Sequence, residues 1–334
     1  MEELSYLKKV ESNARTYAAT FEQLFVSGQG MRIKDAHGKE YLDCLSNAGT
    51  LALGHNPPEV KAAVLEFLAG DHLQQGLDLA TPAKHAFVQE LFSLLPSAMR
   101  NSSKILFCGP TGSDAVEAAI KLARHYTQRS ALMAFQGGYH GMTAGALSAM
   151  GNLRPKSSHG IIAQDTHFLP FPYRFRCPFG TNGEHTEQLS IDYIRNVLTK
   201  PAAVLVEVVQ GEGGCIPTSA KWLQELREIT LEQEILLIID EVQTGLGRTG
   251  TTFALEHSGI VPDILVLSKA IGGVCRSPRH LGSGHPRRNL PWQPVGDGRR
   301  RRNHAPHSRE PVGCQCRSHG QSTRERAEAD CPAL

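Results

Sequence analysis

The sequence predicts an α/β protein whose central sheet is mainly parallel. Three short runs, at residues 202–209, 235–240 and 263–268, are aliphatic almost throughout, which is typical of strands buried on both faces. An amphipathic stretch at residues 221–234 is long enough for a helix and separates the first two runs. This alternation indicates βαβ units, which build parallel sheets.

Local signals predict the remaining elements. Residues 35–41, DAHGKEY, predict the turn of a hairpin between the short strands MRI and YLDCL. Prolines and a glycine bound two expected helices, at residues 57–70 and 82–96. Further along the chain we expect, in order, a strand over residues 104–109, a helix over 113–127 with Ser113 as its N-cap, and a strand over 131–136.

The size and composition are ordinary for a globular protein. The 334 residues are enough for one large domain and a smaller one, and the formal net charge of +2 suggests no special partner. The N-terminal residues lack the apolar core of a signal peptide, and no stretch approaches the roughly 18–20 apolar residues of a membrane span. We therefore expect a cytoplasmic protein that binds neither a membrane nor nucleic acid.

The cysteines fit a reducing compartment. Cys44, Cys108, Cys177 and Cys215 lie in the body of the chain without regular spacing. We therefore expect them to include buried small hydrophobic residues rather than disulfide partners.

Residues 275–334 differ sharply from the rest of the sequence. They hold 12 arginines, no lysine and 5 acidic residues, and they lack Ile, Phe, Tyr and Met. Such a segment buries too little apolar surface to offset its ordering entropy, so we expect a disordered tail. Two other interpretations have weaker support. The run Arg299–Arg302 lacks the aromatic residues of a nucleic-acid site, and Cys314 and Cys316 do not have a standard zinc-site spacing.

A glycine pattern follows the second aliphatic run. Gly245, Gly247 and Gly250 form G-x-G-x-x-G, the pattern of dinucleotide-binding turns. Five residues separate the end of the strand at Asp240 from the second half of the motif, and RTGTTFALE does not open a helix cleanly. We therefore expect these glycines to form a flexible loop rather than a nucleotide site.

Two polar residues at the ends of neighbouring strands are more informative. Asp240 ends one aliphatic run and Lys269 follows the next. Asp240 alone could be a helix cap or a member of a structural ion pair, and a lysine at a strand end is usually a surface residue. Together they suggest pyridoxal 5′-phosphate (PLP), for which the lysine forms the Schiff base and the acid holds the pyridine nitrogen protonated.

The other groups that PLP requires are also present. Gly112 and Ser113 lie in a glycine-rich turn before a helix, where backbone N–H groups and the helix dipole favour a phosphate. Tyr139, beside His140 in GGYHG, offers an aromatic face for the cofactor ring. These residues complete a candidate cofactor site.

These motifs resemble the class III PLP-dependent aminotransferases, which have the type I fold of PLP-dependent transferases. The resemblance covers about residues 10–273 and rests on IIDEVQTGLGRTG, PDILVLSKAIGG, TGSDAVEAAIKLAR, GGYHG and VEVVQGEGG, in the order usual for the family. YLDCLSNAGTLALGHN, LDLATPAK and GGYHGMTAGALSAMGNL resemble the diaminobutyrate–2-oxoglutarate aminotransferases within it.

The resemblance implies a role for each candidate residue. Lys269 would be the Schiff-base lysine and proton shuttle, and Asp240 would pair with the pyridine nitrogen. Val242 would pack against the ring and Gln243 would bond its 3′-oxygen. Gly112 and Ser113 would hold the phosphate and Tyr139 would stack on the ring, with His140 as a further cofactor-binding residue. Glu212 resembles the glutamate that pairs with a late arginine and swings away when a 2-oxo acid arrives.

The resemblance also implies a reaction and an assembly. Glutamate and L-aspartate 4-semialdehyde would give 2-oxoglutarate and L-2,4-diaminobutyrate, in a homodimer serving a siderophore or ectoine-type pathway. Ornithine and 4-aminobutyrate are the alternative amine substrates. The tail departs from this pattern, because nothing in it matches the phosphate-binding threonine of the partner subunit or the arginine that would meet Glu212.

We interpret the tail as the product of a frameshift near codon 274. The expected division is residues 1–54 contributing to a small domain, 55–274 as an incomplete PLP-binding large domain, and 275–334 as the non-homologous tail. Two hypotheses follow: a working aminotransferase, or a truncated and inactive relative that at most binds PLP.

Overall fold

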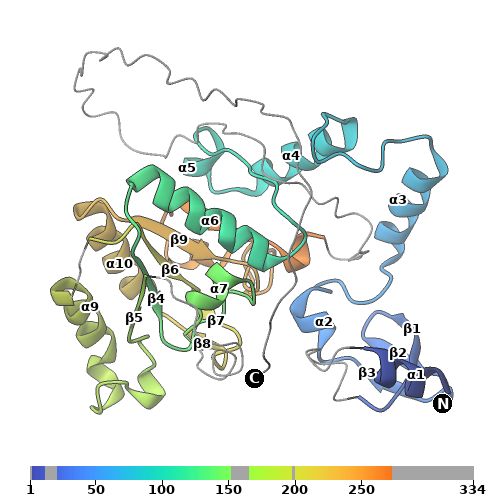
Figure 1. The fold of residues 1–334 in the computed structure, drawn as a ribbon, viewed down its shortest axis with the longest axis horizontal. Coiled ribbons are helices and arrows are strands. Elements are labelled where there is room, and N and C mark those ends of the chain that lie inside the picture. The colour runs from blue at the N-terminus through green and yellow to red at the C-terminus, as the bar shows by residue number, and fades with distance from the viewer. Residues whose placement is uncertain (1, 12–20, 152–164, 198–199, 273–334) are drawn as a thin grey trace, which may run out of the picture. The chain divides into compact units, whose positions relative to one another are not determined.

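The central sheet is parallel, as predicted. The computed structural model describes residues 2–11, 21–151, 165–197 and 200–272, and within them five strands form one sheet in the order β10-β9-β6-β4-β5 (Figure 1). Every neighbouring pair of these strands is parallel. The strands are β4 (Leu132–Phe135), β5 (Thr166–Leu169), β6 (Ala203–Val206), β9 (Leu236–Asp240) and β10 (Ile264–Val266).

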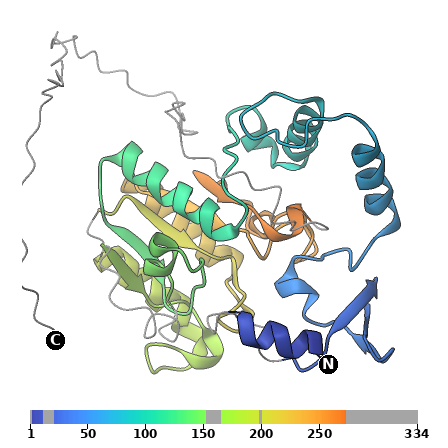
Figure 2. The same ribbon diagram turned by 45° about the vertical axis from the view of Figure 1, so that its right-hand side comes forward.

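Helices cover both faces of this sheet (Figures 1 and 2). On one face α6 (Gly112–Thr127) packs Val116, Ile120 and Ala123 against alternate strand residues such as Ile238. On the other face α10 (Ala220–Glu232) contributes residues to a cluster that includes Leu237 and Ile239. Because neighbouring strand residues point to opposite faces, a strand covered on both sides must be apolar throughout.

The register aligns the carboxyl ends of the strands. Val206 pairs with Ile239, and Val266 pairs with Asp240. The loops that leave β6, β9 and β10 therefore begin at the same edge of the sheet, which is where open α/β sheets place their ligands.

The N-terminal residues form a separate antiparallel sheet in the order β1-β2-β3. The predicted hairpin is present, and its turn is held by Asp35, whose Oδ1 accepts hydrogen bonds from the backbone N–H groups of His37 and Lys39 at 2.9 Å each. The strands are β1 (Phe25–Gln29), β2 (Arg32–Asp35) and β3 (Glu40–Leu42).

The helices predicted from prolines are also present, as α3 (Pro58–Ala69) and α4 (Pro82–Leu94). Thr81 caps α4 by accepting a hydrogen bond from the N–H of Lys84. The remaining elements are α1 (Glu2–Val10), α2 (Ser46–Gly49), α5 (Ser97–Arg100), α7 (Ala144–Ser148), α9 (Thr186–Val197), β7 (Val209–Gln210), β8 (Ile216–Pro217) and the 3₁₀ helices η2 (Arg174–Arg176), η3 (Gly183–His185), η4 (Ala254–His257) and η5 (Lys269–Ile271).

Three local expectations are wrong. Residues 104–109 do not form a strand, because a strand needs a paired neighbour and no described strand pairs with them. The N-cap of α6 is Thr111 rather than Ser113, since the capping box needs the acid at its third helical position, Asp114. The four described cysteines are exposed or half-buried and none is buried. The predicted tail, residues 275–334, lies outside the described residues.

Candidate functional site

Asp240 is the centre of the candidate site. It is the last residue of β9 and only 3% exposed. Its Oδ2 lies 2.7 Å from Nδ1 of His140, and its Oδ1 accepts a hydrogen bond from the N–H of Val242 at 3.0 Å. A turn follows β9, so Asp240 does not cap a helix and its buried partner is the imidazole.

His140 lies in the loop after β4 and is 4% exposed. Burial alone would lower its pKa, but the hydrogen bond to Asp240 and the charges of Asp240 and Glu207 outweigh burial and raise the pKa of His140. The imidazolium therefore persists to a higher pH than usual and places a positive charge beside the Asp240 carboxylate.

Glu207 is a third buried member that sequence reasoning did not single out. It directly follows β6 and is 5% exposed. Its Oε2 accepts a hydrogen bond from the N–H of Tyr139 at 2.9 Å, and its Oε1 accepts one from Gly211 at 3.2 Å. Burial, with a smaller contribution from the charge of Asp240, raises the pKa of Glu207 to about 7. An acid that interrupts an otherwise aliphatic run was the signal that could have revealed it.

The start of α6 lies against the loop that follows Asp240. Gly112 is the first residue of α6 and is buried, and a Cβ at this position would lie 2.7 Å from Cγ1 of Val242. Only glycine allows this close approach. Ser113 contacts Gly141, and its Oγ accepts a hydrogen bond from the N–H of Met142 at 3.2 Å. The predicted phosphate turn, Val242 and the loop of Tyr139 and His140 therefore meet.

Lys269 follows β10, the strand that pairs with the strand ending in Asp240. Val266 pairs with Asp240, and its carbonyl accepts a hydrogen bond from the N–H of Glu241 at 2.9 Å. Lys269 follows three residues later, half-buried, in η5. Its φ of +43° is in the left-handed region, which is uncommon for a residue with a side chain. The sheet thus brings the predicted lysine and acid to neighbouring strand ends.

Two other predicted residues lie around Gly211. The side chain of Gln243 contacts Gly211 so closely that a Cβ on Gly211 would overlap with it. Glu212 is the next residue and is exposed on the turn between β7 and β8. Its predicted role toward an incoming 2-oxo acid stays a prediction.

The glycine motif after β9 forms turns, as expected, and opens no α-helix. Gly247 and Gly250 have φ values of +89° and +94°, which explains why glycine occupies both positions. A dinucleotide-binding turn would instead lead directly into a helix, so the fold does not support that interpretation.

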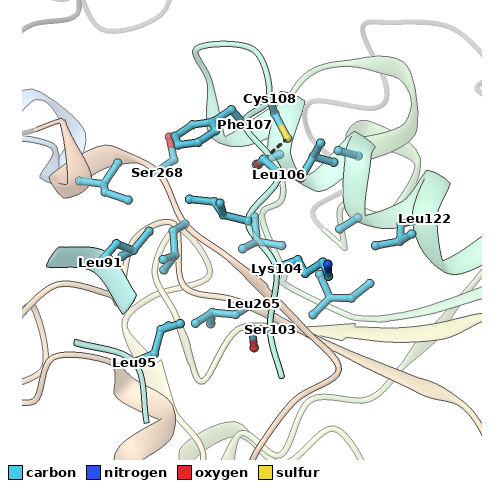
Figure 3. Close-up of a pocket in the computed structure, with 18 of the residues that line it drawn as sticks. Leu91, Leu95, Ser103, Lys104, Leu106, Phe107, Cys108, Leu122, Leu265 and Ser268 are labelled. Atoms are coloured by element: carbon cyan, nitrogen blue, oxygen red, sulfur yellow. Dashed lines mark hydrogen bonds between the residues drawn. The ribbon is translucent and has the colours of Figure 1, made fainter. Parts of the chain in front are cut away.

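An apolar cavity of about 290 Å³ lies elsewhere, on the β10 side of the sheet (Figure 3). Its walls come from α4, residues 103–111, α6, β10 and η5. Side chains such as Leu91, Leu95 and Leu265 dominate them (Figure 3), and the charged residues Lys104 and Asp263 also line the cavity.

Two absences hold for the described residues. Among them no helix combines the length and apolar character needed to cross a membrane. Nor does the described part of the chain gather three or more His, Cys, Asp or Glu residues in a group suited to a metal ion.

Comparisons with known proteins identify the family. The family described as "Aminotransferase class-III" matches residues 14–278. The diaminobutyrate–2-oxoglutarate aminotransferases of Rhizobium meliloti and Haemophilus influenzae are 49% and 46% identical, over 79% of this chain in each case. A PLP-bound amine transaminase from an uncultivated Pseudomonas species has a TM-score of 0.71 and 30% identity, over 79% of this chain and 62% of that one.

The chain spans only part of the length of these relatives. It covers 57% of the Rhizobium meliloti protein and 59% of the Haemophilus influenzae protein. The prediction of a frameshift or truncation near residue 274 stays a prediction.

Proposed function

Because this chain belongs to the class-III aminotransferase family, we propose that it binds PLP and transfers an amino group between an amine and a 2-oxo acid. The observation that carries the proposal is the placement of Lys269 one strand end away from a buried Asp240 that is paired with His140. Glutamate as donor and L-aspartate 4-semialdehyde as acceptor, giving 2-oxoglutarate and L-2,4-diaminobutyrate, are supported by the names of relatives 49% and 46% identical.

The residues present fit the cofactor. A carboxylate can accept about four hydrogen bonds, and the structure describes two at Asp240, so it retains capacity for a pyridine N–H. The N-terminus of α6, with Gly112 and Ser113, suits the phosphate, and Val242 lies against Gly112 at the same place. Tyr139 would contribute the second face for the ring.

Each residue then has a distinct task. PLP, when bound, supplies an electron-withdrawing ring that stabilises negative charge on the substrate carbon. The Lys269 amine would take a proton from that carbon and deliver it to C4′ of the cofactor. Asp240 would hold the ring nitrogen in its protonated form, and the His140 imidazolium would keep a positive charge behind that carboxylate. Gln243 would orient the ring oxygen and Glu212 would respond to the incoming 2-oxo acid.

The remaining assignments are proposals of the same standing. They are a homodimer, a cytoplasmic location, a siderophore or ectoine-type pathway, and the division into residues 1–54, 55–274 and 275–334. An inactive relative that only binds PLP is the competing proposal.

An absorbance spectrum of the purified chain with added PLP tests the proposal. We expect a visible band that is absent from Lys269→Ala and retained in Lys221→Ala, a change at an exposed lysine of α10. Release of 2-oxoglutarate from glutamate would then separate turnover from binding alone. A band of equal strength in Lys269→Ala would refute the assignment of the lysine.

If the band forms, the amine substrates can be compared. Faster amination of aspartate 4-semialdehyde than of the semialdehydes from ornithine or 4-aminobutyrate supports the diaminobutyrate reaction. The reverse order would favour one of the alternatives. A band without any turnover would favour the inactive relative.

A further inference from the structure

Glu207 is a buried acid that the proposed reaction does not use. In the sheet order β9-β6-β4, the strand that precedes Glu207 lies between the strand that ends in Asp240 and the strand that leads to His140. Glu207 therefore leaves the sheet between the two members of the buried pair.

Its contacts tie the two neighbouring loops together. Oε2 accepts from the N–H of Tyr139, the residue before His140, and Oε1 accepts from the N–H of Gly211, the residue before Glu212. One carboxylate thus fixes both the loop of the proposed ring-stacking residue and the turn of the proposed substrate residue. Removing it would leave two partly buried backbone N–H groups without their acceptor at once.

The same carboxylate also lies close to the imidazole. A Cβ on Gly138 would be 3.1 Å from Nε2 of His140 and 3.7 Å from Oε2 of Glu207, so both atoms lie over the same small residue. Nδ1 of His140 is occupied by Asp240. Asp240 thus contacts one ring nitrogen of His140, and Glu207 lies in the neighbourhood of the other.

The charges of this group are unbalanced. Asp240 and Glu207 are two buried carboxyl groups, and His140 offers one positive charge between them. Glu241, which is 1% exposed, is a further acid beside Asp240, but its carboxylate accepts hydrogen bonds from Thr244 and from the N–H groups of Ala254 and Leu255. Burial nevertheless outweighs these hydrogen bonds and raises the pKa of Glu241. The acids whose charges act on His140 are Asp240 and Glu207.

We propose that Glu207 is a positioning residue that holds His140 in its charged form and so maintains the positive charge behind Asp240. The inference deepens the proposed function, on which it rests for the role of Asp240 toward the cofactor. The hydrogen bonds from the N–H groups of Tyr139 and Gly211 fix the position of the Glu207 carboxylate.

The arrangement predicts a pH dependence. With a pKa of about 7, Glu207 is a carboxylate above that pH and neutral below it. Above that pH its carboxylate therefore stabilises the charged form of His140, and this effect is lost on acidification. Its contribution to stability has the opposite sign. Because the pKa in the folded protein lies above the ordinary value of 4.5, that contribution is complete below pH 4.5 and is lost as the pH rises through about 7.

An NMR titration of the PLP-free chain, labelled with ¹⁵N at histidine, tests the proposal. The His140 resonance is assigned by its loss in His140→Gln. We expect a lower titration midpoint for His140 in Glu207→Gln and an unchanged midpoint in Glu228→Gln, an exposed position on α10. An unchanged midpoint in a folded Glu207→Gln would overturn the proposal, because a purely structural Glu207 leaves the His140 equilibrium alone.

A second measurement uses the unmutated protein, in case Glu207→Gln does not fold. The carboxyl ¹³C signals of labelled glutamate should include one that titrates near pH 7, and the His140 resonance should shift in the same step. The absence of any His140 shift in that step would exclude the coupling. Neither measurement needs PLP, so failure of the proposed function appears separately, as the absence of a visible band when PLP is added.

Discussion

The carboxyl-end cluster (Asp240, His140 and Glu207) and the apolar cavity on the β10 side lie in the same α/β unit but are built in opposite ways. In the cluster every member is buried and hydrogen-bonded to a neighbouring loop. Around the cavity the walls are mainly apolar. Residues 104–109, for which the sequence predicts a strand, have no strand partner among the described residues. The register of the strands is enough to bring the polar side chains of the cluster together. An apolar run such as residues 104–109 forms a strand only if another strand pairs with it.

The largest expected effect concerns the opposite ends of the same strands. Arg227 and Asp263, 12% and 10% exposed, form two hydrogen bonds, and Asp263 also accepts the N–H of Leu237 at 2.8 Å. Arg227→Met leaves this carboxylate buried without its partner and should lower the free energy of unfolding by about 3–5 kcal/mol, as measured by urea denaturation.

Lys200→Met provides the matched control, because its ion pair with Glu234 is exposed. We expect almost no change in the urea midpoint for it, because water and salt screen an exposed pair. Equal losses for the two variants would mean that β9 and β10 do not depend on a buried pair at their amino ends.

Truncations on the two sides sharpen the comparison directly. Leu237 is fully buried in the packed core, so Leu237→Ala should lower the free energy of unfolding by about 2–5 kcal/mol. Leu265 lines the cavity and already lacks neighbours on that side, so Leu265→Ala should cost clearly less in the same urea experiment. The contrast between the two regions fails if Leu265→Ala costs as much as Leu237→Ala.

The smallest expected effect lies where the two regions meet, at the start of α6. Thr111 lines the cavity and caps the helix whose first residue contacts Val242. Thr111→Ala should lower the free energy of unfolding by about 1 kcal/mol, since the N–H of Asp114 loses its acceptor. Thr111→Ser keeps the hydroxyl and should restore most of the loss in thermal unfolding. A loss that Ser does not restore would assign the effect to packing in the cavity.

The parts of the fold that local signals determine were predictable. Aliphatic runs gave β6, β9 and β10, and prolines marked the starts of α3 and α4. Residues 104–109 carry the same apolar signal as a strand but lack pairing, which no local pattern contains. The cap of α6 was misplaced by two residues because Ser113 and Thr111 both suit an N-cap, and only the reciprocal bond to Asp114 distinguishes them.

The candidate site was predictable to a similar extent. Asp240 and Lys269 were identified because each ends or follows a buried strand, and the register brings those strand ends together. Glu207 was missed because it sits inside an aliphatic run, and its main partner, Tyr139, is 68 residues away in the sequence. The contact of His140 with Asp240 spans 100 residues and depends on the order of the strands, which periodicity does not specify.

The left-handed backbone of Lys269 has a consequence for engineering. Glycine adopts such a φ freely, whereas a residue with a side chain costs roughly 1–2 kcal/mol there. A programme that selects variants for heat resistance alone would therefore favour Lys269→Gly and remove the amine on which the proposed chemistry depends. At this position robustness and catalysis make opposite demands, so a stabilised library should hold residue 269 constant and seek its gains elsewhere.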